Sequence, residues 1–174
     1  QLTIFEKYIS EARYLGEIGL DYSDSNCNRE KQKELFEHIV FLANKSDDKI
    51  LTVHSRRAEK DVLDVTQDFS GTVIMHWYSG SIKNLERAII EDKYFSINQQ
   101  MVKSQSGKKI IEKIPLDRVL IESDAPFTNG LENKYTVDFM NDVYEGISSI
   151  KHIPTEELQI VFKNNFKTIL LKNR

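Results

Sequence analysis

The chain has 174 residues, 40% of them hydrophobic, which is enough to bury one core and indicates a single domain. Its formal net charge of -3 excludes a broadly basic protein that coats nucleic acid, although a local cationic cleft remains compatible with it. The single cysteine, Cys27, excludes an internal disulfide framework and favours a reducing cytoplasm, and the longest apolar runs are too short to cross a bilayer.

The predicted elements alternate along the chain between short β-branched strands and longer charged helices. Strands are expected at 14–20, 50–54, 72–76, 94–98 and 118–121. Helices are expected at 29–45, 59–69, 81–91, 105–113, 135–149 and 155–171. Successive βα units predict a parallel sheet, and strands that are apolar on both faces indicate a sheet covered on both sides.

Residues able to bind a metal lie in or near the ends of four predicted strands. Glu17 lies in GEIGLDY, His54 and His76 end the strands ILTVH and TVIMH, and Asp124 follows RVLI. Since the active sites of (β/α)8 barrels lie at the carboxyl ends of the strands, these side chains are expected to converge. Two imidazoles and two carboxylates suit Zn²⁺, Mn²⁺ or a related ion, and a carboxylate that bridges two ions serves two-metal hydrolysis.

Each of these residues also has a purely structural interpretation. A lone histidine after an apolar strand is more often a hydrogen-bonded structural residue than a ligand, but two on successive strands reverse that preference. A buried Glu17 requires a cationic partner, which is either a metal or an arginine. Asp124, which precedes Ala125 and Pro126, is equally suited to organising a turn.

Four motifs taken in order resemble those of the TatD family of metal-dependent deoxyribonucleases. They are GEIGLDY, VHSR, MHWYSGS and IPLDRVLIESDAP, and NNFKTIL resembles the last helix of that family. The resemblance extends from about Gly16 to Leu170. It implies an α/β fold of the TIM-type (β/α)8 barrel, with about five βα units in a single TatD-like hydrolase domain over residues 1–174.

The resemblance also assigns roles to the candidate ligands. It implies that Glu17 bridges two divalent ions (Mg²⁺, Mn²⁺ or Zn²⁺), that His54 and His76 bind one of them, and that Asp124 binds the other and positions the attacking water. Glu17 and Asp124 are thus the expected catalytic residues.

The residues around these ligands allow more than one interpretation. Arg56 is expected to contact a substrate phosphate or, equally well, to form a salt bridge at the barrel rim. Ser79 is expected to line the substrate groove, whereas Tyr78 is expected to pack as an aromatic core residue. Glu122 is expected beside the ligands or in a salt bridge at the strand end.

The sequence also departs from the family. Arg57 stands where the family has an acid, and the H-x-H motif that opens the family's barrel does not occur. We therefore expect the three N-terminal βα units to lie outside this sequence, and the open barrel face to be covered by that segment or by a partner chain.

The predicted function is the metal-dependent hydrolysis of DNA phosphodiester bonds by a cytoplasmic enzyme that uses two metal ions. The alternative is a catalytically impaired or partner-dependent TatD-like subunit of a multi-protein complex, such as an antiviral (anti-phage) defence system. A third interpretation keeps the barrel and changes the substrate to an ester, lactone or amide.

Overall fold

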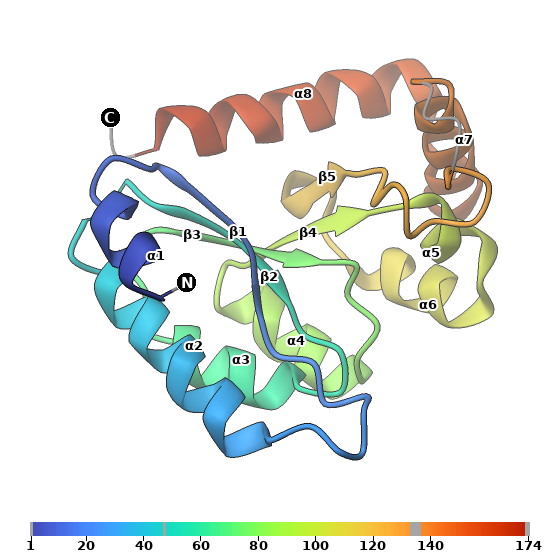
Figure 1. Ribbon diagram of the computed structural model, residues 1–174. Coiled ribbons are helices and arrows are strands. Elements are labelled where there is room, and N and C mark those ends of the chain that lie inside the picture. Colours follow the sequence, from blue (N-terminus) through green and yellow to red (C-terminus); the bar gives the residue numbers. More distant parts are fainter. Residues whose placement is uncertain (1, 47, 133–136, 173–174) are drawn as a thin grey trace.

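The computed structural model describes residues 2–46, 48–132 and 137–172 of the chain. Within these residues, one parallel sheet has the order β1-β2-β3-β4-β5 (Figure 1). The strands are β1 (Tyr14–Gly19), β2 (Ile50–His54), β3 (Thr72–His76), β4 (Tyr94–Ile97) and β5 (Val119–Ile121). The predicted α/β fold with five parallel strands is confirmed.

The helices alternate with the strands, as the periodicity indicates. They are α1 (Leu2–Tyr8), α2 (Arg29–Ala43), α3 (Glu59–Thr66), α4 (Ile82–Ile90), α5 (Gln99–Lys103), α6 (Gln105–Lys113), the 3₁₀ helix η1 (Leu116–Arg118), α7 (Phe139–Lys151) and α8 (Thr155–Leu171). Three of them, α1, α5 and η1, are not predicted from the sequence. The helix predicted at 135–149 corresponds to α7, which begins later than expected, at Phe139. The predicted positions 135 and 136 lie outside the described residues.

The two faces of the sheet are covered differently. Helices α2, α3 and α4 lie along one face, and α8 runs along the other (Figure 1). Leu51, Val53 and Met75 are fully buried in the main core. The alternate residues Ile50 and Ile74 form a smaller cluster on the α8 side, together with Tyr94 and Ile169. This alternation follows from the period of two along a strand.

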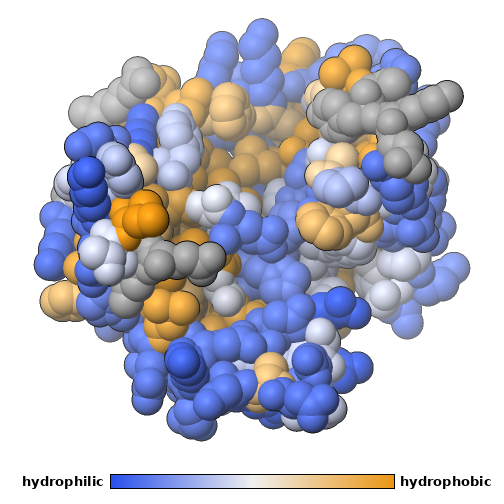
Figure 2. All heavy atoms as spheres, viewed as in Figure 1, coloured by the Kyte–Doolittle hydropathy of each residue, from blue (hydrophilic) through white to orange (hydrophobic). Residues whose placement is uncertain are grey.

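The side of the sheet that faces α8 is incompletely filled. A hollow of about 430 Å³ lies between the face of strands β2 to β5 that is turned toward α8 and the helices α7 and α8. Its lining includes Ile74, Leu120 and Phe166. Figure 2 shows apolar atoms in this hollow below α8. Asn165 anchors α8 to the sheet, because its side-chain amide donates to the carbonyl oxygens of Leu116 at 2.7 Å and Val119 at 2.8 Å.

None of the described helices is both long enough and apolar enough to cross a membrane.

Gly19 brings β1 close to the end of β2. Its φ of +133° is one that other residues rarely adopt, and a Cβ there would collide with the carbonyl oxygen of His54. That close approach allows the Leu20 N–H to donate to the same oxygen at 3.1 Å. The glycine therefore fixes the carboxyl end of β1 against that of β2.

Gly19→Ala is expected to lower the free energy of unfolding by at least about 2 kcal/mol, because strained backbone and steric overlap add. Gly130→Ala is the matched control, since Gly130 also has a positive φ of +93° but faces open space. Because its backbone strain remains while the steric overlap is absent, it is expected to cost about 1–2 kcal/mol, which is less than the loss in Gly19→Ala. Urea unfolding measures the free energy of unfolding of both variants. Equal decreases would contradict the conclusion that the close approach of Gly19 to His54 stabilises the fold.

Candidate metal centre

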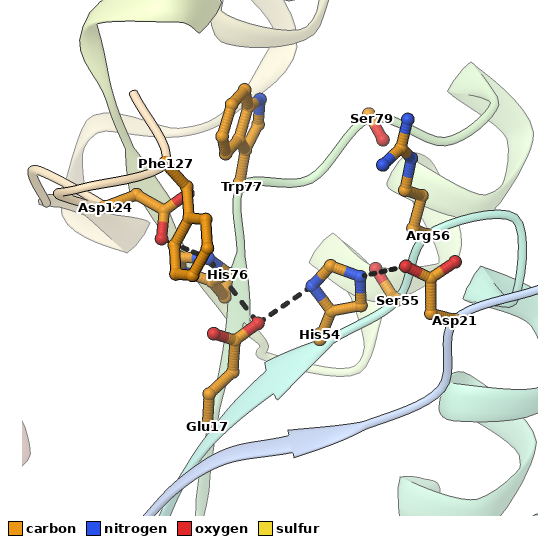
Figure 3. A pocket seen from close by; sticks show the side chains of 10 residues that line it. All are labelled: Glu17, Asp21, His54, Ser55, Arg56, His76, Trp77, Ser79, Asp124 and Phe127. Carbon is orange, nitrogen blue, oxygen red and sulfur yellow. Dashed lines mark hydrogen bonds and ion pairs between the residues drawn. The ribbon is translucent and has the colours of Figure 1, made fainter. Parts of the chain in front are cut away.

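Glu17 of β1 and the last residues of β2 and β3, His54 and His76, form a cluster of metal-capable side chains. One ligand atom from each lies within 4.8 Å of the others. Glu17 Oε1 is 2.8 Å from His54 Nδ1 and 3.6 Å from His76 Nε2 (Figure 3). The carboxyl ends of parallel strands share one edge of the sheet, so the predicted convergence of these three side chains is confirmed. We call them the donor cluster.

Asp124 joins the donor cluster from the loop after β5. Its Oδ1 lies 3.4 Å from His76 Nε2, and its side chain is 12% exposed. Its carbonyl oxygen accepts the N–H groups of Phe127 at 2.8 Å and Thr128 at 3.1 Å. Asp124 therefore organises a turn, as one interpretation of the sequence expects, and its carboxylate also faces the donor cluster.

The second ring nitrogen of His76 is held by Glu122. The Nδ1–H of His76 donates to Glu122 Oε2 at 2.6 Å, and the amide of Asn98 donates to Glu122 Oε1 at 3.2 Å. The Ser96 hydroxyl donates to the same carboxylate. Burial alone would lower the pKa of His76, but the hydrogen bond to Glu122 and the surrounding negative charges outweigh burial and raise that pKa. Glu122 thus leaves Nε2 of His76 facing the donor cluster.

Asp21 holds His54 in the corresponding way but through the opposite nitrogen. Asp21 Oδ2 lies 3.2 Å from His54 Nε2 and leaves Nδ1 facing Glu17. The backbone of Asp21 exchanges two hydrogen bonds of 3.0 Å with the side-chain amide of Gln32 on α2. Burial acts to raise the pKa of Asp21, but hydrogen bonds from Ser23 and the proximity of His54 lower it overall. The two carboxylates fix which nitrogen each imidazole presents.

The chemistry of the site fits a divalent cation. Four carboxylates, those of Glu17, Asp21, Glu122 and Asp124, surround two imidazoles. Burial and the nearby charge of Glu17 raise the pKa of Asp124, which shows how crowded the negative charge is there. Imidazole nitrogens and carboxylate oxygens that converge in this way are the donors that Zn²⁺ and Mn²⁺ take from proteins.

A pocket of about 670 Å³ opens above these side chains. It is lined by Glu17, Asp21, His54, Ser55, Arg56, His76, Trp77, Ser79, Asp124 and Phe127 (Figure 3). The pocket therefore contains all four predicted ligands together with both predicted substrate-binding residues, Arg56 and Ser79. Arg56 is exposed, and among the described residues its guanidinium forms no ion pair.

The sequence matches the family model described as TatD related DNase over residues 2–171. The chain belongs to this family. A TatD homologue of known structure from Escherichia coli superimposes with a TM-score of 0.82 at 23% identity, over 97% of this chain and 69% of the homologue. The expected likeness to the TatD barrel is thus confirmed at the level of the fold.

Two curated relatives are similar over most of the chain. An uncharacterized metal-dependent hydrolase of Methanocaldococcus jannaschii is 30% identical over 155 residues, which are 88% of this chain and 61% of the relative. The human deoxyribonuclease TATDN3 is 25% identical, over 95% of this chain and 63% of the relative. The chain therefore spans about three-fifths of the length of these TatD-related proteins.

Other residues of this TatD-related chain line the pocket or lie next to residues that line it. Tyr78 is buried, packs edge-on against Phe95 and donates to the Ser81 carbonyl at 2.7 Å, so its predicted aromatic packing is confirmed. Sequence reasoning missed Asp21, Trp77 and Phe127. Asp21 had a usable signal, because it lies in the GEIGLDY motif and a ligand histidine requires an acceptor for its second nitrogen.

Asp21→Ala is expected to weaken the binding of Mn²⁺ or Zn²⁺ between about tenfold and a hundredfold, because His54 loses the acceptor that orients its ring. The measurement is calorimetric titration of the metal-free protein. Asp24→Ala is the matched control, since Asp24 also caps a backbone N–H in the same loop, that of Asn26, and lies outside the pocket. A loss of affinity that is the same in both variants would show that Asp21 acts only through the loop.

Proposed function

We propose that the protein hydrolyses phosphodiester bonds of DNA, using divalent ions held by Glu17, His54, His76 and Asp124. The observation that carries the proposal is the convergence of these donors in a pocket that is also lined by Arg56, whose guanidinium forms no ion pair with the described residues. Metal-dependent hydrolysis is the chemistry named for relatives in this family, and deoxyribonuclease is the activity named for the human one.

The ligands divide between two ions in this proposal. His54, His76 and Glu17 would hold one ion, and Glu17 and Asp124 would hold the other. Bound divalent ions neutralise the phosphate oxygens and lower the pKa of a water molecule to near neutrality. In this proposal Asp124 also orients the attacking water, since its carboxylate faces the donor cluster.

Arg56 and Ser79 complete the phosphate site in this proposal. Since no described carboxylate pairs with it, the Arg56 guanidinium is available to pair with two phosphate oxygens. The exposed Ser79 hydroxyl on the same wall can donate to a third oxygen.

The test is a substrate panel. Protein with Mn²⁺, Mg²⁺ or Zn²⁺ is expected to shorten end-labelled DNA, and EDTA is expected to stop the reaction. A p-nitrophenyl ester, a lactone and an amide serve as parallel substrates with the same metals. Hydrolysis of one of these without cleavage of DNA would overturn the proposal in favour of a barrel with a different substrate.

A partner-dependent subunit is the second candidate function, and two observations favour it. Asp21 and Glu122 hold the imidazoles, which leaves Glu17 and Asp124 as the described carboxylates of the cluster for the second ion. The hollow between the sheet and α8 also presents apolar side chains. For this candidate, the protein alone is expected to bind metal without cleaving DNA, and cleavage by the purified chain alone would exclude it.

A further inference from the structure

Two aromatic side chains stand directly beside predicted metal ligands. Trp77 follows His76 at the end of β3, and Phe127 lies in the turn that Asp124 begins. Both line the pocket of the donor cluster, where Figure 3 shows their rings on the side of Asp124. Neither residue has a part in the hydrolysis proposed above, so their positions require a separate explanation.

Phe127 carries an apolar ring that a hydrogen-bonded turn holds in solvent. Its side chain is 78% exposed, although burial would be favourable for a ring of this size. Its N–H donates to the Asp124 carbonyl at 2.8 Å, and the fully buried Thr128 fixes the turn by donating to the Ser123 carbonyl at 2.6 Å. The turn that positions Asp124 therefore also fixes the phenyl ring at the edge of the pocket.

Trp77 is held with one part against the core and another part in the pocket. It is half-buried against the main core and also lines the pocket. Its φ of +38° lies in the left-handed region, which is unfavourable for a bulky residue unless the surroundings impose it. The next residue, Tyr78, is almost fully buried and anchors the backbone at this point.

The ligand that fits this arrangement is flat, apolar on its faces and attached to a phosphate. The pocket is lined by the donor cluster, by the exposed Arg56 and by the two rings, which offer aromatic surface beside the charged groups. Nucleobases stack on exposed aromatic side chains irrespective of their sequence. An aliphatic ester or amide would gain no such contact.

We propose that Trp77 and Phe127 form a nucleobase-binding site that stacks on the base next to the scissile phosphate. This inference rests on the proposed function, because it takes the phosphate at the donor cluster as given. A base inside a duplex does not expose its faces, so the site selects single-stranded or frayed ends.

The test uses Trp77 as its own reporter, since it is the single tryptophan of the chain. A short phosphorothioate-linked oligothymidylate, chosen because such linkages resist hydrolysis, is titrated with Mg²⁺ present. A strand of the same length and charge that carries abasic residues is the comparison. The oligothymidylate is expected to quench the fluorescence and to bind about fivefold to a hundredfold more tightly than the abasic strand. Equal affinity and equal quenching for both strands overturn the inference.

Substitution provides a second readout. Phe127→Ala is expected to weaken binding of the oligothymidylate and to reduce its advantage over the abasic strand. Phe41→Ala, which removes a phenyl ring that is 64% exposed on α2 and outside this pocket, is expected to leave both unchanged. If Phe127→Ala does not fold, the comparison of the two strands with the unsubstituted protein still decides.

The failure of this inference and the failure of the proposed function give different results. Metal-dependent cleavage of normal and abasic DNA at equal rates supports the hydrolase and overturns the base site. Quenching that depends on the base, without cleavage of any DNA, supports the base site and overturns the hydrolase.

Discussion

Glu17→Gln is expected to abolish metal binding at the donor cluster and to lower hydrolysis at least about a thousandfold, which corresponds to about 4 kcal/mol of transition-state stabilisation. One oxygen of Glu17 faces both His54 Nδ1 and His76 Nε2, so this carboxylate is common to the whole cluster. Glutamine keeps the shape of the side chain, but it carries no charge and replaces one acceptor oxygen with a donor. Calorimetric titration with Mn²⁺ measures the first effect, and initial rates on labelled DNA measure the second.

The same substitution should not destabilise the metal-free protein. Burial is the main cause of the raised pKa of Asp124, and the negative charge of Glu17 adds to it; removing that charge relieves the repulsion between the two carboxylates. We therefore expect an unchanged or higher melting temperature together with the loss of activity, a pattern typical of functional residues. Glu34→Gln, at an exposed position of α2 outside the pocket, is the control for the change in net charge. Hydrolysis that persists in Glu17→Gln would falsify the role of this carboxylate.

The fold and the donor cluster can be predicted from the sequence because both depend on regular strands. β-branched runs locate the strands, parallel pairing aligns their carboxyl ends, and His54 and His76 are simply the last residues of β2 and β3. By contrast, α5 has only five residues and depends on the Asn98 side chain, which accepts the N–H groups of Gln100 and Met101. Such a short helix carries too little hydrophobic periodicity to be recognised.

The surroundings of the ligands could not be predicted because they depend on loops. The backbone of Asp21 is held by Gln32, eleven positions away on a helix, and its contact with His54 spans 33 positions. The exposure of Phe127 is a property of one turn, and hydrophobicity alone predicts the opposite. The sequence thus locates the metal-capable side chains, whereas the contacts that orient them are seen only in the structure.

Glu122→Leu is expected to lower the free energy of unfolding of the metal-free protein by about 3–5 kcal/mol. The Glu122 carboxylate is 14% exposed and accepts hydrogen bonds from three groups, those of His76, Ser96 and Asn98. Leucine leaves these donors without their acceptor in a largely buried site. Glu122→Gln is expected to cost less, because it keeps one acceptor oxygen but turns an NH₂ group toward the remaining donors. Urea unfolding in EDTA measures both variants.

The decrease in the free energy of unfolding caused by Glu122→Leu should become smaller as pH rises. Glu122 raises the pKa of His76 above its unfolded value, so its contribution is fully present below the unfolded pKa of about 6.5 and decreases as pH rises through the higher folded value. The variant should therefore be most destabilised near pH 5.5 and less so near pH 9. Glu86→Leu, which breaks the exposed pair between Glu86 and Lys113, should cost less than about 1 kcal/mol at either pH. A loss in Glu122→Leu that is equally small, or that grows as pH rises, would mean that Glu122 does not hold the protonated ring of His76. In that case the orientation of His76 Nε2 toward the donor cluster would need another cause.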